Sequence, residues 1–231
     1  MLKIHKTVTP SPAQWEIIVE GMRNPFNSWN KIDSYTTHIE DSETLETADF
    51  QFFFGEADLS LARNLAKAGS DHRKFLRQIL VHVTLTAPLY WWKEYDTYKV
   101  GTVANSCSTM HKIHAKEFTL DDFSHEHLTA KSLKHLSDTI EILNEYRHEY
   151  LYTKDKLFWW QMIQTLPSSY DQMRTCTLNY ENLMNIYHAR RNHKLDEWHT
   201  FCDWIETLPY ADKLIINCAH GDTVGESENK Q

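Results

Sequence analysis

Amide and cationic side chains gather in the last third of the sequence, in a run that is compatible with a helix. Helical periodicity over residues 166–198 groups the following residues on one side or at its edge: Asn179, Asn182, Asn185, Ala189, Arg190 and His193. Each asparagine lowers helix stability by roughly 0.5 kcal/mol relative to alanine, so three in one window call for a separate reason. Amides suit the edge of a heteroaromatic ring or a ribose, and Arg190 could clamp a phosphate or carboxylate. The alternative is a solvated helix face or a contact between subunits.

Cys107 and two histidines are the other candidates for chemistry. Cys107 stands in a run of small polar residues, 101–109, where a reactive thiol and an ordinary loop residue both fit. His111 and His114 are spaced i, i+3, which would place two metal ligands on one helical turn of a metal-dependent hydrolase. Because no HExxH-type signature accompanies them, we predict no metal site.

Length and composition indicate a folded protein. The 231 residues, 41% of them hydrophobic and 13% aromatic, can bury a sizeable core. We expect one domain over residues 1–220 and a polar tail over 221–231. A formal net charge of -8 argues against general nucleic-acid binding, which requires a cationic surface, but it permits a small anionic ligand at a local cluster of cations.

The spacing of the cysteines and the lengths of the apolar segments indicate the cellular compartment. The four cysteines show no CxxC spacing, and the first residues lack the apolar stretch of a signal peptide. No window approaches the ~20 apolar residues of a membrane span. These patterns favour a cytoplasmic protein with reduced thiols that does not associate with membranes.

Hydrophobic periodicity predicts an α+β fold that is richer in helix than in strand. Residues 79–86 alternate, with Val81, Val83 and Leu85 on one face, and form the clearest strand. Ala87-Pro88 ends that strand and begins an aromatic helix over 89–99, whose Trp and Tyr side chains fit a core better than a stacked cofactor. The other expected elements are a strand at 2–8, helices at 12–22, 60–68, 70–77, 120–150 and 196–208, and a short aromatic segment at 159–163.

The order strand, Ala87-Pro88, helix and polar loop, together with a late Leu-Pro segment, resembles the flavin-dependent thymidylate synthases. In that family the late signature is Leu-Pro followed by T-x-N-x-x-S-L-M-N-F-x-x-x-R. The residues that stand in register here are Leu166, Pro167, Thr177, Asn179, Leu183, Met184, Asn185 and Arg190. Trp198 matches a family Trp if one inserted residue is allowed, and the resemblance covers about 60–210.

The resemblance implies a fold, ligands and an assembly. It implies a central antiparallel sheet packed with several long helices, in a homotetramer whose sites lie between subunits. The family binds FAD and dUMP and uses NADPH and methylenetetrahydrofolate to make dTMP. By resemblance, Asn179 and Asn185 would contact the flavin or its ribityl chain, and Arg190 would contact the nucleotide.

The family's other signature, Arg-His-Arg followed after seven residues by Ser, is rewritten in this sequence. Alignment on Ala87-Pro88 places Thr97, Tyr98 and Lys99 on the first three positions and Cys107 on the Ser. Cys107 is therefore the candidate catalytic nucleophile. The predicted cofactor contacts outside the late segment are Lys99, His72 and Arg73, and the further predicted substrate contacts are Arg174, Glu94 at a family Gln, and Thr109 at a family Arg.

Loss of the Arg-His-Arg positions supports an alternative function. A guanidinium fork binds phosphate through two hydrogen bonds, and of the three positions only Lys99 keeps a positive charge. The alternative is a non-catalytic nucleotide-binding or assembly protein with the same fold.

Overall fold

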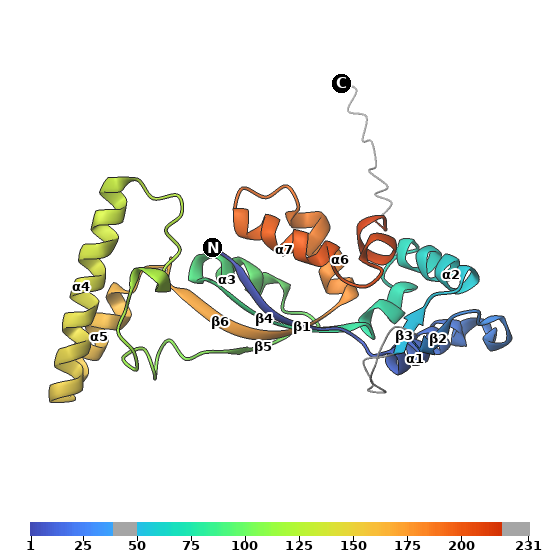
Figure 1. Ribbon diagram of the computed structural model, residues 1–231, viewed down its shortest axis with the longest axis horizontal. Coiled ribbons are helices and arrows are strands. Elements are labelled where there is room, and N and C mark those ends of the chain that lie inside the picture. The colour runs from blue at the N-terminus through green and yellow to red at the C-terminus, as the bar shows by residue number, and fades with distance from the viewer. Residues whose placement is uncertain (39–49, 219–231) are drawn as a thin grey trace, which may run out of the picture. The chain divides into compact units, whose positions relative to one another are not determined.

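The computed structural model describes residues 1–38 and 50–218, which divide into two compact units (Figure 1). Unit 1 contains Met1–Thr7, His82–Thr177 and His193–Phe201. Unit 2 contains the described residues of Val8–Val81, Leu178–Asn192 and residues 202–218. The predicted tail over 221–231 lies outside the described residues, and the single domain predicted over 1–220 stays a prediction.

The main sheet has the strand order β1-β4-β6-β5 within the described residues. Its strands are β1 (Lys3–Val8), β4 (Leu80–Pro88), β5 (Val103–Ser106) and β6 (Asp171–Asn179). Strands β5 and β6 are antiparallel, and Val103 lies opposite Thr177. The α+β class and the antiparallel sheet predicted from the sequence are confirmed.

Polar pairs fix the register of β4 against β6. The Nδ1 atom of His82 lies 2.9 Å from the hydroxyl of Thr177, and the hydroxyl of Thr84 lies 2.9 Å from that of Thr175. Because residue numbers rise along β4 while they fall along β6, these strands are also antiparallel. The alternation predicted for β4 is confirmed, since Val81, Val83 and Leu85 are buried on the opposite face.

Aromatic residues of α3 (Leu89–Tyr95) build a core in unit 1. Trp91 and Trp92 are almost completely buried, and the Trp91 ring lies 4.7 Å from the ring of Trp198 at the start of α7 (Asp196–Glu206). Pro88 precedes α3 with extended backbone, as the sequence predicts. These side chains therefore pack a core, as expected from the sequence, and are not available to stack on a cofactor.

A second core in unit 1 lies between α4 (Ala130–Thr153) and α5 (Lys156–Thr165). The sequence predicts a hydrophobic stripe of Leu133, Leu136, Ile140 and Leu143 on this helix. It is confirmed for the last three, which are buried there, while Leu133 is half-buried. The helix predicted over 120–150 begins ten residues later, because the Thr129 side chain accepts a hydrogen bond from the Ser132 N–H and caps α4. Neither α4 nor any other helix within residues 1–38 and 50–218 is long and apolar enough to cross a membrane.

Unit 2 is a set of helices around a small hairpin. Trp15 of α1 stacks on Phe52 with ring centroids 5.7 Å apart and meets the rings of Tyr180 and Tyr210 edge-on. The hairpin strands β2 and β3 pair antiparallel, with Tyr35 opposite Phe53, and the sequence reading did not predict them. The elements are α1 (Pro12–Arg23), η1 (Asn24–Phe26), β2 (Tyr35–His38), β3 (Phe50–Phe53), α2 (Glu56–Lys67), η4 (Arg73–Arg77), α6 (Tyr180–Arg190) and η7 (Asp212–Ile216).

A buried ion pair joins the end of α1 to the start of α2. The guanidinium of Arg23 donates to the Asp58 carboxylate at 2.5 Å, and the Asp58 side chain is 0% exposed. The other carboxylate oxygen accepts from the Ser34 hydroxyl at 2.7 Å and from the backbone N–H groups of Asp33 and Ser34. One carboxylate thus fixes two helices and the turn that leads into β2.

The Asp58 pair predicts an acid-sensitive contribution to stability. Burial by itself raises the pKa of Asp58, but the hydrogen bonds from Ser34 and Arg23 outweigh it and hold that pKa below its usual value. A carboxyl group whose pKa is lower in the folded state stabilises the fold above its unfolded pKa and loses that effect as the pH falls. We expect Asp58→Asn to lower the free energy of unfolding at pH 7 by about 3 kcal/mol, because Arg23 stays buried without its counterion.

Urea denaturation at a series of pH values checks this prediction. The difference between wild type and Asp58→Asn should shrink as the pH falls from about 5 towards the acid range. Asp138→Asn is the matched control, since Asp138 forms an exposed pair with Lys134 and should change stability by less than ~1 kcal/mol. A difference that is constant with pH would show that the Asp58 charge is not responsible.

Candidate functional site

The segment that carries the amide and cationic residues is a strand followed by two helices. The run over 166–198, compatible with one helix in the sequence, is divided: Asp171–Asn179 forms β6, and the helical part that carries Asn182, Asn185 and Arg190 is α6. Burial in β6 alternates, with Gln172, Cys176 and Leu178 on the buried side. His193 lies beyond the end of α6 and so leaves the predicted amide face.

Asn179 caps the first turn of α6. Its side-chain oxygen accepts from the N–H of Asn182 at 2.9 Å, and the Asn182 side-chain oxygen accepts from the N–H of Asn179 at 3.2 Å. Asparagine is among the most favourable residues at this position, so the cost inferred from the sequence does not apply here. Asn179 is 7% exposed, and its predicted contact with a flavin stays a prediction.

Asn185 and Arg190 lie further along the same helix. Asn185 is exposed and Arg190 is half-buried, while Leu183, Met184 and Ile186 bury the other side of α6. An exposed amide of this kind is available to a ligand or to another subunit, which are the two alternatives that the sequence left open.

The two predicted cofactor residues at the start of η4, His72 before it and Arg73 in it, face different surroundings. His72 is exposed, whereas Arg73 is 1% exposed and its Nη1 lies 3.7 Å from the Met184 sulfur. Burial lowers the pKa of Arg73, and the Glu181 carboxylate, 4.0 Å from its Nε, acts against that shift. Arg73 therefore supports the packing of η4 on α6, and its contact with a flavin stays a prediction.

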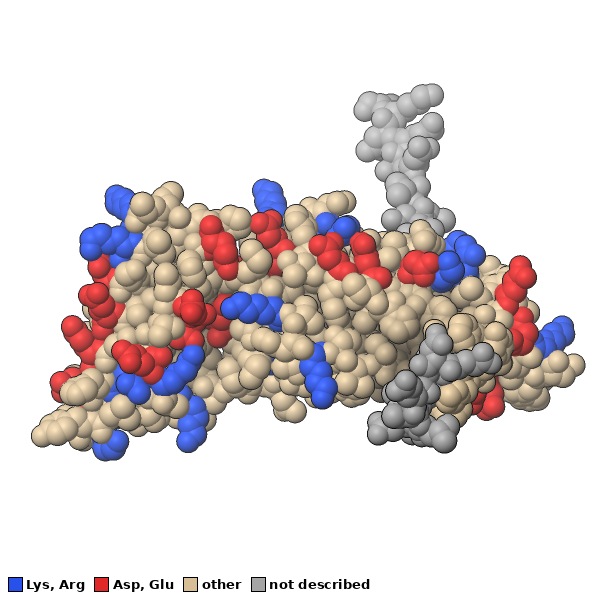
Figure 2. All heavy atoms as spheres, viewed as in Figure 1, with Lys and Arg blue, Asp and Glu red and all other residues tan. Residues whose placement is uncertain are grey.

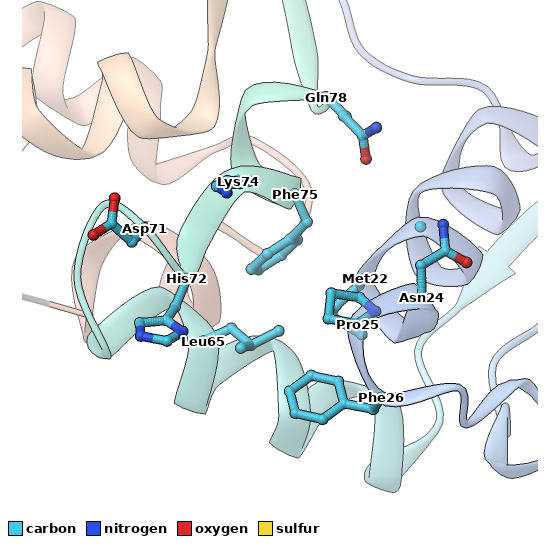
Figure 3. A pocket seen from close by; sticks show the side chains of 11 residues that line it. Met22, Asn24, Pro25, Phe26, Leu65, Asp71, His72, Lys74, Phe75 and Gln78 are labelled. Carbon is cyan, nitrogen blue, oxygen red and sulfur yellow. The ribbon is translucent and has the colours of Figure 1, made fainter.

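A cavity of about 340 Å³ opens between α1, α2 and η4, all of unit 2 (Figure 3). His72 is the predicted site residue that lines it. The apolar side chains around it belong to Met22, Pro25, Phe26, Leu65 and Phe75. The polar side chains belong to Asn24, Asp71, His72, Lys74 and Gln78.

The other predicted site residues lie in unit 1, around α3 and β5. Glu94, near the end of α3, accepts from the Trp198 indole at 3.1 Å, and its carboxylate lies 3.4 Å from Nε2 of His193. The backbone N–H of Leu195 donates to Nδ1 of His193, and the other ring nitrogen, Nε2, faces the Glu94 carboxylate. The glutamate that stands at the family's glutamine position thus contacts two side chains of its own chain, Trp198 and His193.

Cys107 follows a strand that the sequence reading treated as a loop. Strand β5 consists of Val, Ala, Asn and Ser, and the last three have little preference for strands. Cys107 extends this pairing, since its N–H donates to the Met173 carbonyl at 2.9 Å, and it is exposed. Lys99 is exposed and Thr109 is half-buried in the same stretch of chain.

Arg174 is held on three sides. Its Nε donates to the Gln172 side chain at 2.9 Å, its Nη1 donates to Asp96 at 2.9 Å, and its guanidinium carbon lies 4.2 Å from the centre of the Trp92 ring. The Gln172 amide donates in turn to the Cys107 carbonyl at 3.0 Å. The structure thus connects two predicted residues, Arg174 and Cys107, through a glutamine that the sequence reading did not single out.

The histidines considered for a metal site do not form one. Within the described ranges, no group of three or more His, Cys, Asp or Glu side chains is placed to hold a metal ion. His114 packs edge-on against the Tyr150 ring at 4.9 Å, and burial lowers its pKa. The metal-dependent hydrolase therefore has no geometric support in this part of the chain.

The capping geometry predicts that two asparagines of the predicted site differ in their effect on stability. Asn179→Ala should lower the free energy of unfolding by ~1 kcal/mol, because it removes the cap of α6. Asn185→Ala, at an exposed position, should change it by less than ~0.5 kcal/mol. Urea denaturation of the two variants and wild type measures both values, and equal effects would contradict the assignment of Asn179 as a cap.

The four cysteines should differ in reactivity. Cys107 is exposed, whereas Cys176, Cys202 and Cys218 are buried, and burial raises the pKa of Cys202 to about 11. We expect native protein to react with one equivalent of Ellman's reagent in a fast phase at pH 8, and Cys107→Ser to abolish that phase. Denatured protein supplies the total of four thiols. Any fast-reacting thiol that remains in Cys107→Ser would show that one of the buried cysteines is accessible.

Comparison with known proteins identifies the fold. No protein-family model matches the sequence, and no curated protein matches it. Solved structures do match, among them the flavin-dependent thymidylate synthase ThyX from Helicobacter pylori complexed with FAD and dUMP. It is 14% identical with a TM-score of 0.59, and the match covers 94% of this chain and 98% of that one.

Two further structures give the same result. One is another crystal structure of Thymidylate Synthase X from Helicobacter pylori with FAD and dUMP, with a TM-score of 0.59, 14% identity and coverage of 94% of this chain and 97% of that one. The other is the UMP/dUMP methylase PolB from Streptomyces cacaoi bound with 5-Br dUMP, with a TM-score of 0.57, 13% identity and coverage of 92% and 90%. The chain therefore has the α+β fold of the flavin-dependent thymidylate synthases.

Proposed function

We propose that this protein binds FAD and a deoxyuridine nucleotide in a cleft between subunits and transfers a methyl group to dUMP. The observation that carries the proposal is the fold, which matches structures solved with FAD and dUMP over 94% of the chain. The third match, a UMP/dUMP methylase, was solved with a brominated dUMP. The retained late signature, from Leu166-Pro167 to Arg190, adds residue-level support.

The residues of α6 fit the polar parts of such ligands. Asn185 presents an exposed amide that can donate and accept, which suits a flavin pyrimidine edge or a ribityl hydroxyl. Arg190, at the end of the same helix, would contact the nucleotide phosphate. The remaining residues that we propose for the cofactor are also in unit 2: Asn179, His72 and Arg73.

The residues of unit 1 would supply the reacting group and its anchors. The Cys107 sulfur would add to a ring carbon of uracil and would be expelled again, with return of the electron pair to sulfur, once the neighbouring carbon holds the one-carbon group. Lys99 would pair with a phosphate, and Thr109 would donate a hydrogen bond. The Asp96, Arg174 and Gln172 contacts would hold the Cys107 backbone in place. When bound, the flavin would supply a hydride, NADPH would reduce it, and methylenetetrahydrofolate would supply the one-carbon group.

The size of the His72 cavity supports a site built from more than one copy of the chain. Its volume of about 340 Å³ is near the lower end of the range for ligand pockets, ~300–1,000 Å³, and a dinucleotide such as FAD needs more room. A homotetramer with sites between subunits would supply the remaining walls. Together with the predicted cytoplasmic location, this assembly is part of the proposal.

The surface charge suits a local anion site rather than an extended cationic surface. On the face drawn in Figure 2, lysine and arginine side chains of the described residues lie among acidic ones. The formal net charge is -8. Phosphate recognition would therefore rest on individual cations such as Arg190 and Lys99.

A non-catalytic nucleotide-binding or assembly protein is the second candidate. It is favoured by the pairing of Glu94 with His193 and Trp198, and of Arg174 with Asp96, which uses polar groups of the predicted substrate site within the chain itself. Such a protein would bind nucleotide without turnover.

The absorption spectrum of purified protein titrated with FAD separates the two candidates. We expect a bound-flavin spectrum that NADPH bleaches, and dTMP formation when dUMP and methylenetetrahydrofolate are added. Arg190→Gln should weaken dUMP binding at least tenfold, because a charge-assisted hydrogen bond contributes about 1.5–3 kcal/mol. Lys194→Gln, which removes one exposed cation four residues later, is the matched control.

Three outcomes would contradict the leading proposal. They are protein that stays colourless at saturating FAD, flavin that NADPH does not reduce, and dUMP affinity that is equal in Arg190→Gln and wild type. Colourless protein that dUMP nonetheless stabilises against heat would support the non-catalytic candidate. Light scattering after size-exclusion chromatography tests the tetramer.

A further inference from the structure

We infer that the outer face of the α4–α5 hairpin binds an amphipathic helix of another protein, through arginine and apolar side chains of that helix. The outer face is the side of α4 that points away from the core around Leu136, Ile140 and Leu143, together with Phe158 of α5 at its edge. All of it belongs to unit 1. The inference does not depend on binding of a flavin or a nucleotide.

Acidic residues recur along the outer face at helical spacing. Glu141, Glu145 and Glu149 are exposed and four residues apart, and Asp138 precedes them on the same side. Figure 2 shows acidic side chains gathered in a column over α4, at the left of the view. Like charges at this spacing repel each other, and the last turn of α4 has no basic residue to balance them. A cationic partner would relieve this repulsion.

These carboxylates are not consumed by strong contacts within the chain. Over residues 1–38 and 50–218, Glu141 and Glu145 form no ion pair and no side-chain hydrogen bond. Glu149 lies 3.9 Å from Nδ1 of His148, and both side chains of that pair are largely exposed. The carboxylates of the outer face are therefore available to cations of another molecule.

A groove in the outer face combines carboxylates with aromatic rings. Its volume is about 460 Å³, and its lining residues are Asn144, Glu145, Tyr146, His148, Glu149 and Phe158. The ring centroids of Tyr146 and Phe158 lie 6.4 Å apart. A guanidinium stacks on an aromatic ring and forms two parallel hydrogen bonds with a carboxylate, whereas an ammonium is a single point charge. The groove therefore favours arginine over lysine.

Exposed apolar side chains accompany the carboxylates on the outer face. Tyr152 is 84% exposed and Ile142 is 40% exposed, and helical spacing places both on the side of α4 that carries Glu145 and Glu149. Apolar surface rimmed by polar side chains marks sites for other proteins. The face extends over ~20 Å of α4, or about four turns of a helix laid along it. These features fit a helix with arginines on one side and apolar residues beside them.

Charge favours a different protein over a second copy of this chain at the outer face. The formal net charge of the chain is -8, so copies repel each other on average. Arg77 and Arg191, which a second copy could offer, already pair with Glu181 and Asp203 of their own chain. A basic partner is attracted instead, and its approach is accelerated by the opposite charge.

Fluorescence anisotropy of a labelled peptide added to the full-length protein tests the inference. The probe is an amphipathic peptide of about 16 residues, ~24 Å long as a helix, with arginines along one side and leucines along the other. We expect saturable binding that Glu145→Gln/Glu149→Gln weakens roughly tenfold, because each exposed ion pair contributes a few-fold. Glu16→Gln/Glu20→Gln is the matched control, since it removes two exposed glutamates at the same spacing in α1 and should not change the affinity.

Further measurements separate the contributions of shape, charge and folding. A peptide with lysine in place of each arginine should bind roughly fivefold more weakly. Tyr152→Ser should weaken binding of the arginine peptide roughly threefold through the lost apolar contact. In urea denaturation, Glu145→Gln/Glu149→Gln should be at least as stable as wild type, because it removes a repulsion, so its weaker binding cannot come from unfolding.

Four results would overturn the inference. Three are the absence of saturable binding at low salt, equal affinity of wild type and Glu145→Gln/Glu149→Gln, and equal affinity of the arginine and lysine peptides. The fourth comes from light scattering. If Glu145→Gln/Glu149→Gln dissociates an assembly of wild-type protein that does not bind the peptide, the outer face is a contact between copies of this chain.

Discussion

The ion pair between Arg23 and Asp58 is the contact on which the arrangement of unit 2 depends. A buried carboxylate is costly unless every lone pair is satisfied, and here hydrogen bonds from Arg23, Ser34 and two backbone N–H groups meet that need. The contact fixes the end of α1 against the start of α2. Since η1 continues directly from α1, the same pair sets the distance between Phe26 and the α2 and η4 walls of the cavity. The shape of the cavity lined by His72 thus depends on an ion pair that does not itself line the cavity.

Local patterns predicted the elements whose burial is one-sided. The alternation in β4 and the stripe in α4 correspond to the buried faces of both, because each element packs on one side only. The β2–β3 hairpin escaped prediction, since its four-residue strands are too short for a clear period. Strand β6 escaped because the same segment also carries a helical period into α6. Asn179 marks the junction as the cap of α6, and a cap is identified only once the helix start is known.

In the candidate site, local sequence spacing identified some residues, whereas others are recognised only from their contacts in the folded chain. The late signature located Asn185 and Arg190 on one helix, as local spacing can do. Gln172 and Asp96 were not found, because their importance arises from contacts with Arg174 across 2 and 78 residues of chain. Gln172 did leave one signal: a polar residue on the buried side of β6, where an apolar one is expected. The cavity lined by His72 likewise consists of segments that lie far apart in the sequence, and only the fold brings them together.

The charged side chains around α3 have partners within the chain, and this affects how the missing family arginines could be replaced. A Glu at position 94 would repel a phosphate if it were free, yet its carboxylate faces the indole of Trp198 and the imidazole of His193. Arg174 could have replaced a missing guanidinium, yet its Nε and Nη1 are engaged by Gln172 and Asp96. The charges that changed in this loop are thus balanced within the chain. Anion binding in the proposed cleft would then depend on Lys99 and Arg190, one flexible point charge and one guanidinium, which gives fewer fixed contacts than the family's Arg-His-Arg signature would.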